Sequence, residues 1–225
     1  MSRETFLAKV RSAAEAGRAY RVHHREIPPN AGYLGGGDDL VGRFASEVIA
    51  CGGFAEVFDD LSGLRSRLDA LVAEIAPRSA LCWRHPLLER LDLRALLSQH
   101  GVEMLTHDEL APLDREEQRR RMFAAELGIS SVTWAIAETG SAAVASGPGT
   151  ERLASLLPPV YVTVVESAQI LPDLFDLFAK FDAASGGELP TNLALITGPS
   201  KTGDIELKLT TGVHGPGRWH VLVSR

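Results

Sequence analysis

The feature that most limits the fold of this chain is an alternation of short apolar runs with longer amphipathic stretches between residues 40 and 127. Strands that alternate with helices in this way pair in parallel, and the helices pack against the sheet. The pattern predicts an α/β fold, with an open, mostly parallel sheet and helices on both faces. Apolar spacing predicts helices at residues 40–50, 62–76, 87–98 and 114–127, and strands at residues 54–58, 80–83 and 101–105.

The N-terminal part of the chain has a different character. Residues 2–19 place apolar side chains at helical spacing, whereas residues 21–39 are irregular and end in Gly35-Gly36-Gly37-Asp38-Asp39. The glycines could cradle a ligand, but two adjacent carboxylates would repel a phosphate, so a hinge is the favoured interpretation. We therefore divide the chain into an N-terminal helical arm, residues 1–39, and one α/β domain, residues 40–225.

Composition narrows the possible partners. The chain has 225 residues, of which 45% are hydrophobic, so it is long and apolar enough for a core of domain size. Its formal net charge is −6 and no basic, aromatic-interleaved stripe occurs, which predicts no nucleic-acid partner. No run of about 18 apolar residues occurs, which predicts no membrane span. The N-terminus lacks an apolar core of signal-peptide type, so a cytoplasmic location is expected.

Cysteines and short motifs limit the cofactors. Cys51 and Cys82 are the only cysteines, and we expect two reduced, buried thiols. An iron–sulfur cluster or a structural zinc site of the four-thiolate type needs four cysteines, so this chain alone cannot supply either. The sequence also lacks an HExxH pair, a GxxxxGK[ST] loop and a GxGxxG after the first strand. We therefore predict no metal site and no cofactor in this chain.

From residue 128 onward, short strands and glycine-rich turns follow one another. Residues 132–137 and 142–145, joined by residues 138–141, predict a β-hairpin. The remaining elements are expected as a strand at residues 161–165, a helix at residues 170–181, a strand at residues 193–196, and a last strand at residues 218–224 that closes the sheet.

The stretch after residue 196 combines small, hydroxyl-bearing and charged residues. Gly198 and Pro199 end the strand, and Ser200 or Thr202 can cap a following helix. Free backbone N–H groups and the helix dipole make a helix N-terminus an anion site. Lys201 adds a cation there, so the stretch predicts an anion site built from a strand, a turn and a helix N-terminus.

We expect this stretch to meet two other loops. In an open α/β sheet, loops at the carboxyl ends of neighbouring strands line one crevice, here residues 138–141, 198–206 and 214–216. Glu138 and His214 are the candidate catalytic residues, because a carboxylate and an imidazole form an acid–base pair. The candidate substrate-binding residues are Thr139, Gly140, Ser141, Arg152, Gly198, Pro199, Ser200, Lys201, Thr202, Asp204 and Gly215.

Several of these candidates also have a structural interpretation, and both interpretations stay open. Thr139 and Gly140 have the chemistry of a hairpin turn. Asp204 suits the first turn of a helix, where a carboxylate satisfies free N–H groups. Lys201 is of a residue type that usually lies in solvent, and Arg152 could form a surface ion pair.

Four motifs in a fixed order carry a family resemblance. They are Ala135-Ile-Ala-Glu-Thr-Gly-Ser141, Arg152 with Leu156-Leu-Pro158, Thr197-Gly-Pro-Ser-Lys-Thr-Gly-Asp-Ile-Glu206 and Gly212-Val-His-Gly-Pro216. Together they resemble the lactate utilization protein C family, the LUD domain, most strongly over residues 128–225. The family usually has Arg where Lys201 stands, and Lys keeps the charge without the bidentate geometry.

The resemblance implies a three-layer α/β/α sandwich, similar to ribose-phosphate isomerase, glucosamine-phosphate deaminase and the CoA transferases. It also implies a role in oxidising L-lactate to pyruvate beside iron–sulfur partner subunits. In that role this chain is a non-redox subunit that binds a small carboxylate or a partner. Two alternatives stay open: a stand-alone isomerase- or CoA-transferase-like enzyme that acts on a phosphorylated or carboxylate molecule through Glu138, and a non-catalytic sensor or scaffold.

Overall fold

The computed structural model describes residues 2–18, 35–185, 190–202 and 210–225. The chain forms two units, residues 1–34 and residues 35–225. In the first unit, α1 (Arg3–Arg18) is the helix that the sequence predicts there. The rest of that unit's arm, residues 19–34, lies outside the described residues. In the described parts of both units, no helix is long and apolar enough to cross a membrane.

The glycine–aspartate sequence forms the start of the second unit. Asp39 is the N-cap of α2 (Leu40–Ala50), and its Oδ1 accepts the N–H of Gly42 at 3.0 Å. Gly36 is buried, and a Cβ on it would lie 2.8 Å from the Cα of Pro172. At these two residues, the predicted hinge therefore has a capping role and a packing role.

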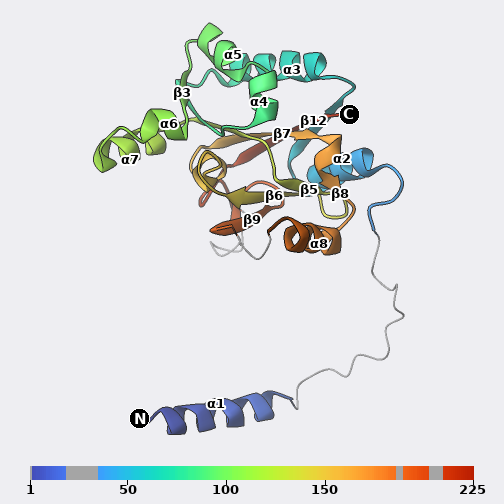
Figure 1. Ribbon diagram of the computed structural model, residues 1–225, viewed down its shortest axis with the longest axis vertical. Coiled ribbons are helices and arrows are strands. Elements are labelled where there is room, and N and C mark those ends of the chain that lie inside the picture. Colours follow the sequence, from blue (N-terminus) through green and yellow to red (C-terminus); the bar gives the residue numbers. More distant parts are fainter. Residues whose placement is uncertain (1, 19–34, 186–189, 203–209) are drawn as a thin grey trace. The chain divides into compact units, whose positions relative to one another are not determined.

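A six-stranded sheet, parallel throughout, forms the centre of the second unit (Figure 1). This sheet confirms the predicted α/β architecture. Its buried strands are rich in Val, Ile and Leu, as is typical of a sheet that is covered on both faces. In spatial order the strands are β1 (Phe54–Phe58), β12 (Arg218–Ser224), β7 (Val160–Glu166), β4 (Leu127–Ser130), β2 (Ser79–Cys82) and β3 (Glu103–Leu105).

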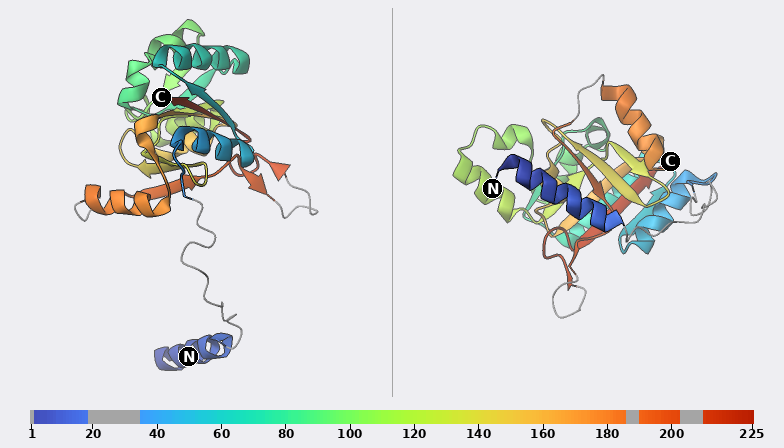
Figure 2. Two further views of the ribbon diagram at one scale, coloured as in Figure 1. Left: turned by 90° about the vertical axis from the view of Figure 1, so that its right-hand side faces the viewer. Right: turned by 90° about the horizontal axis from the view of Figure 1, so that it is seen from below.

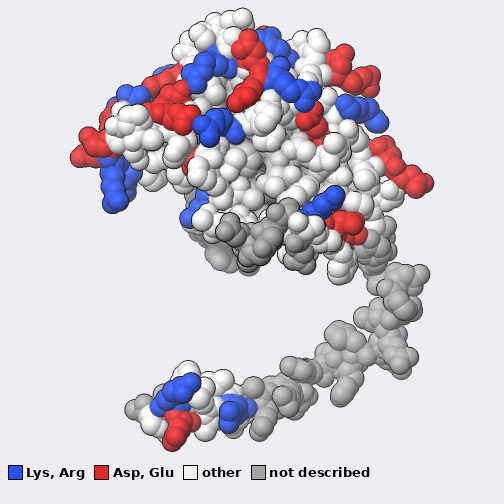
Figure 3. All heavy atoms as spheres, viewed as in Figure 1, with Lys and Arg blue, Asp and Glu red and all other residues white. Residues whose placement is uncertain are grey.

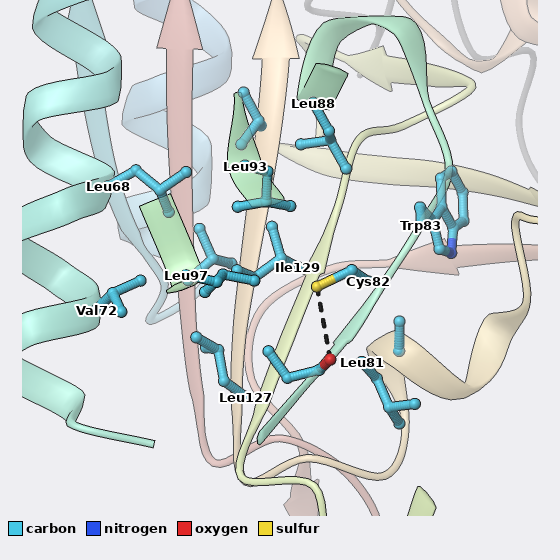
Figure 4. Packing of buried hydrophobic residues seen from close by; sticks show 14 of the residues in the cluster. Leu68, Val72, Leu81, Cys82, Trp83, Leu88, Leu93, Leu97, Leu127 and Ile129 are labelled. Atoms are coloured by element: carbon cyan, nitrogen blue, oxygen red, sulfur yellow. Dashed lines mark hydrogen bonds between the residues drawn. The ribbon is translucent and has the colours of Figure 1, made fainter. Parts of the chain in front are cut away.

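Helices rich in leucine cover one face of this sheet. They are α3 (Leu61–Ile75), α4 (Pro86–Arg90) and α5 (Leu93–Gln99). Figure 4 shows that Cys82 of β2 points toward these helices, whereas its neighbours Leu81 and Trp83 point to the other side of the strand. Two further helices, α6 (His107–Leu110) and α7 (Arg115–Ala124), follow β3.

The opposite face is covered by α2 and by a smaller sheet. In order, the strands of that sheet are β8 (Ile170–Leu171), β5 (Trp134–Ile136), β6 (Ser141–Ser146) and β9 (Asn192–Ile196). The antiparallel pairing of β5 with β6 confirms the predicted hairpin. On the far side of this sheet, α8 (Leu174–Ser185) packs through Leu177 and Phe181 (Figure 2). The third layer of the sandwich is therefore a mixture of helix and sheet.

Three expectations about the elements are wrong in detail. The helix predicted at residues 114–127 ends at Ala124, because the backbone of Ala125 is extended and β4 already begins at Leu127. The helix predicted at residues 170–181 begins as β8, and Pro172 separates that strand from α8. The last strand, β12, pairs with both β1 and β7, so it lies inside the sheet and does not close it.

Charges of both signs are interspersed over the face of the molecule shown in Figure 3. Three arginines make ion pairs with carboxylates of later elements: Arg84 with Asp108 at 3.1 Å, Arg90 with Glu166 at 2.7 Å and Arg94 with Glu109 at 2.6 Å. Each of these pairs is largely exposed and contributes roughly 0–1 kcal/mol. The apolar layers, rather than these pairs, therefore dominate the stability of the fold.

Candidate functional site

The structure brings the three predicted loops together. Ser141 Oγ lies 2.7 Å from Thr197 Oγ1 and 2.8 Å from Thr139 Oγ1, which links the first loop to the second. The backbone N–H of Ser200 donates to the carbonyl oxygen of Pro216 at 2.9 Å, which links the second loop to the third. We call this contact region, residues 138–141, 197–201 and 214–216, the three-loop junction.

The three-loop junction lies at the amino ends of the parallel strands, not at the predicted carboxyl ends. The N–H groups of Gly217 and Arg218, at the start of β12, donate to the carbonyl oxygen of Pro159, which precedes β7. The prediction was wrong because β9 is not a strand of the parallel sheet. It pairs antiparallel with β6 in the smaller sheet, and its following turn therefore points to the other edge.

Two glycine turns of the junction enclose the C-terminal end of α2. Gly140 and Gly198 have φ values of +62° and +82°, a region that glycine adopts easily. A Cβ would lie 2.5 Å from the backbone of Glu47 in the first case and 2.6 Å from the carbonyl oxygen of Cys51 in the second. These glycines therefore allow the backbone of both turns to touch the helix.

Lys201 completes the cap of α2. Its Nζ donates to the carbonyl oxygen of Cys51 at 2.6 Å, and this carbonyl follows the last turn of the helix. A cation near a helix C-terminus is favourable because the helix dipole is negative there. The side chain of Lys201 is exposed, so the remaining N–H groups of its ammonium can reach solvent or a ligand.

Ser200 does not cap a helix, and a helix that Thr202 would cap lies outside the described residues. Lys201–Thr202 is strand β10, which pairs antiparallel with β11 (Thr210–Thr211). The turn after Gly198 therefore continues into a β-ribbon, because the backbone of Ser200 bonds across to Gly212 and Pro216. Asp204 lies outside the described residues.

The remaining candidate site residues, Glu138, His214 and Arg152, differ in burial and position. Glu138 is half-buried in the hairpin turn, and its backbone N–H donates to the carbonyl oxygen of Pro172 at 3.0 Å. His214 is exposed on the loop that leads from β11 to β12. Arg152 is exposed at the start of η1 (Arg152–Ser155). Among the described residues, no hydrogen bond or ion pair joins the side chain of Arg152 to the three-loop junction, and its role in binding stays a prediction.

A cavity of about 400 Å³ opens at the opposite edge, beside the carboxyl ends of β2 and β3. Trp83, His107 and Glu151 line it together with apolar side chains of α6, α7 and η1. A second cavity of about 340 Å³ shares Trp83 and Thr106 with it. These residues were not predicted from the sequence, although sites form at the carboxyl ends of parallel strands, and that rule points here once β2 and β3 are placed.

The two cysteines lie in different environments. Cys51 is half-buried after α2, and its thiol points to the carbonyl oxygen of Thr139 at 3.9 Å. Cys82 is buried in β2, and burial raises the pKa of its thiol. Among the described residues, no group of three or more His, Cys, Asp or Glu side chains is placed to hold a metal ion.

Comparison with known proteins identifies the family. Lactate utilization protein C of Halalkalibacterium halodurans is 31% identical over 157 residues, which span 69% of this chain and 66% of that protein. The protein of the same name from Bacillus subtilis is 28% identical, over 99% of this chain and 96% of that protein.

A crystal structure of a DUF162 family protein from Deinococcus radiodurans has a similar fold, with a TM-score of 0.55 and 19% identity. The similarity covers 83% of this chain and 96% of that one. A family model described as the LUD domain matches residues 45–224, which is most of the α/β unit. The chain therefore belongs to the LUD domain family.

Proposed function

We propose that this chain serves L-lactate utilization as a subunit without redox centres, beside partner subunits that hold iron–sulfur clusters. The names of its relatives in Halalkalibacterium halodurans and Bacillus subtilis support the process. The cysteine count supports placing the iron–sulfur clusters in partner subunits, because two cysteines cannot ligate a four-thiolate cluster. We expect the subunit to work in the cytoplasm.

The observation that supports a site most strongly is the convergence of three of the family-like motifs in the three-loop junction. Hydrogen bonds between Ser141 and Thr197, and between Ser200 and Pro216, join segments that are far apart in sequence. A chain that needed only a stable core would not require hydroxyl, ammonium and imidazole groups at one edge. We propose that this edge binds a small carboxylate or the surface of a partner subunit.

The exposed groups at the junction suit a carboxylate. Lys201 retains free N–H donors beside its bond to Cys51, and His214 adds an imidazole on a neighbouring loop. The hydroxyl groups of Thr139, Ser141 and Thr197 form a continuous row, which can donate or accept. The catalytic roles of Glu138 and His214 stay predictions, and the function proposed here does not depend on them.

A deletion strain of the host tests the function. We expect it to lose growth on L-lactate as sole carbon source and to recover with the full-length gene. Normal growth of a deletion strain that has no paralogue would contradict the proposal.

Affinity purification of the tagged chain from cells grown on lactate should recover iron–sulfur proteins, identified by mass spectrometry and by their iron content.

A surface variant tests the site. His214→Ala should impair growth on lactate while the protein accumulates normally, because the side chain is exposed. His100→Ala is the matched control. His100 is another surface histidine, its Nε2 lies 2.9 Å from Asp69 Oδ1, and it is far along the chain from the junction.

Turnover of a CoA ester or a sugar phosphate by the purified chain alone, abolished by Glu138→Gln, would favour the stand-alone enzyme instead.

A further inference from the structure

The cavity at the carboxyl ends of β2 and β3 has walls that are mostly apolar. Its volume of about 400 Å³ falls in the range of small-molecule sites, roughly 300–1,000 Å³. Leu105, Leu110, Met122 and Leu153 contribute apolar surface, and Trp83 contributes an aromatic ring. Such walls suit a molecule with an apolar body and do not suit a small, fully polar acid.

The polar groups at this cavity are held in place. His107 Nδ1 lies 2.8 Å from Glu151 Oε1, and that oxygen also accepts the N–H of Gly149 at 2.8 Å. The backbone carbonyl of Glu151 accepts the indole N–H of Trp83 at 3.0 Å. One hydrogen bond within the loop and one from Trp83 of another segment therefore position Glu151, and Glu151 in turn positions the imidazole.

The pairing of His107 with Glu151 determines which nitrogen is free. A carboxylate accepts but cannot donate, so in the neutral imidazole Nδ1 carries the hydrogen and Nε2 keeps its lone pair. His107 lines the cavity, and Nε2 is the ring nitrogen that Glu151 leaves unpaired, so Nε2 is the acceptor that the imidazole offers to a ligand. A carboxylate or phosphate would be repelled by Glu151, whereas a hydroxyl group can donate to Nε2.

We propose that this cavity binds a hydroxyl-bearing molecule with an apolar body, of the phenol class, with its hydroxyl donating to His107 Nε2. The site lies at the opposite edge of the parallel sheet from the three-loop junction, and it stands independently of the lactate-related function. Gln118 lines the same cavity, but its Nε2 already donates to the carbonyl oxygen of Leu113 at 2.8 Å. One amide hydrogen of Gln118 is therefore engaged, and we assign recognition of the ligand hydroxyl to the imidazole of His107.

The indole N–H of Trp83 offers a direct readout of binding. In the ¹H–¹⁵N correlation spectrum of the full-length protein, Trp83→Phe identifies its resonance among the three tryptophans. We expect 2-naphthol to shift this resonance saturably below about 1 mM, whereas 2-methoxynaphthalene, which lacks the donor, binds about tenfold more weakly. No saturable shift with 2-naphthol would overturn the proposal.

Three variants separate recognition from general effects. His107→Phe should weaken binding of 2-naphthol about tenfold, because it retains a ring but loses the acceptor. His100→Phe, at the similar pair with Asp69, should leave binding unchanged. Ala111→Trp should abolish binding, since Ala111 is exposed and lines the cavity, so a large side chain there fills it without entering the core. Full binding to the His107 or Ala111 variant would refute the assignment.

Discussion

Two glycines decide how closely the junction loops approach α2. At Gly140 and Gly198 the structure requires both a positive φ and the absence of a Cβ, because backbone atoms of Glu47 and Cys51 occupy that space. Gly140 and Gly198 were predicted to bind substrate, which stays a prediction, and the structure adds a packing role for both against the end of α2. A residue type alone could not distinguish these roles, because glycine suits both a ligand and a packed backbone.

At Gly140 the change to alanine should be strongly destabilising. We expect Gly140→Ala to lower the free energy of unfolding by roughly 3 kcal/mol, because the clash with α2 adds to the strain of the left-handed φ. Urea unfolding followed by circular dichroism measures this loss.

Gly101 provides the matched control for that measurement. Its φ is +68°, but a Cβ there would meet nothing within 4 Å. Gly101→Ala should therefore cost only about 1 kcal/mol, the contribution of the backbone conformation alone. Equal losses of unfolding free energy in the two variants would show that the contact with α2 does not contribute to stability.

At the scale of elements, helix caps made by common capping residues could be predicted from the sequence, whereas a cap made by an uncommon residue could not. The helix predicted at residues 114–127 starts with Asp114, a residue type that caps helices, and its Oδ1 accepts the N–H of Glu117 at 2.9 Å at the start of α7. The cap of α4 is a histidine, since the N–H of Leu87 donates to His85 Nδ1 at 3.2 Å. Histidine is an uncommon cap, so the capping role of His85 could not be expected from its residue type.

This histidine cap should make stability depend on pH. Burial lowers the pKa of His85 below its ordinary value of 6.5, in spite of the opposing influence of Glu166 and Glu89. Above pH 6.5 both the folded and the unfolded state hold it neutral. Below pH 6.5 the unfolded state binds the proton more readily, so the free energy of unfolding should fall as the pH decreases.

Denaturant unfolding between about pH 8 and pH 5.5 checks this dependence. His85→Asn keeps a capping acceptor without a titrating group, so its loss of stability over the same range should be smaller than that of the wild type. Some dependence of stability on pH should remain in the variant, because the pKa of His220 is also lowered. Burial is the largest cause of that shift, and the positive charges of Arg218 and Arg67 add to it. An unchanged slope in the variant would exclude His85 as a contributor.

At the scale of the whole molecule, the central strands should be the most protected from exchange. Both β12 and β7 have parallel partners on each side and are buried almost throughout, whereas β1 has its recorded partner on one side and is half-exposed. We expect hydrogen–deuterium exchange measured by mass spectrometry to be slowest in β12 and β7 and clearly faster in β1. Comparable rates in β1 and β12 would contradict this order.

Much of the architecture was determined by the sequence itself. Apolar periodicity within a few residues distinguishes a helix from a strand, and the alternation of the two types is sufficient for a parallel sheet with helices packed on it. The same local pattern also indicated the hairpin of β5 and β6. These features depend on neighbours in the chain, which is why they could be predicted without coordinates.

The position of the candidate sites was decided only by the tertiary structure. The apolar run at residues 193–196 suits a parallel strand and an antiparallel one equally well, and its pairing with β6 rather than with the central sheet moved the three-loop junction to the amino edge. Likewise, His107 and Glu151 are 44 positions apart and meet only because β3 and η1 converge beside β2. Strand pairing and such contacts join distant parts of the chain, so no local pattern encodes them.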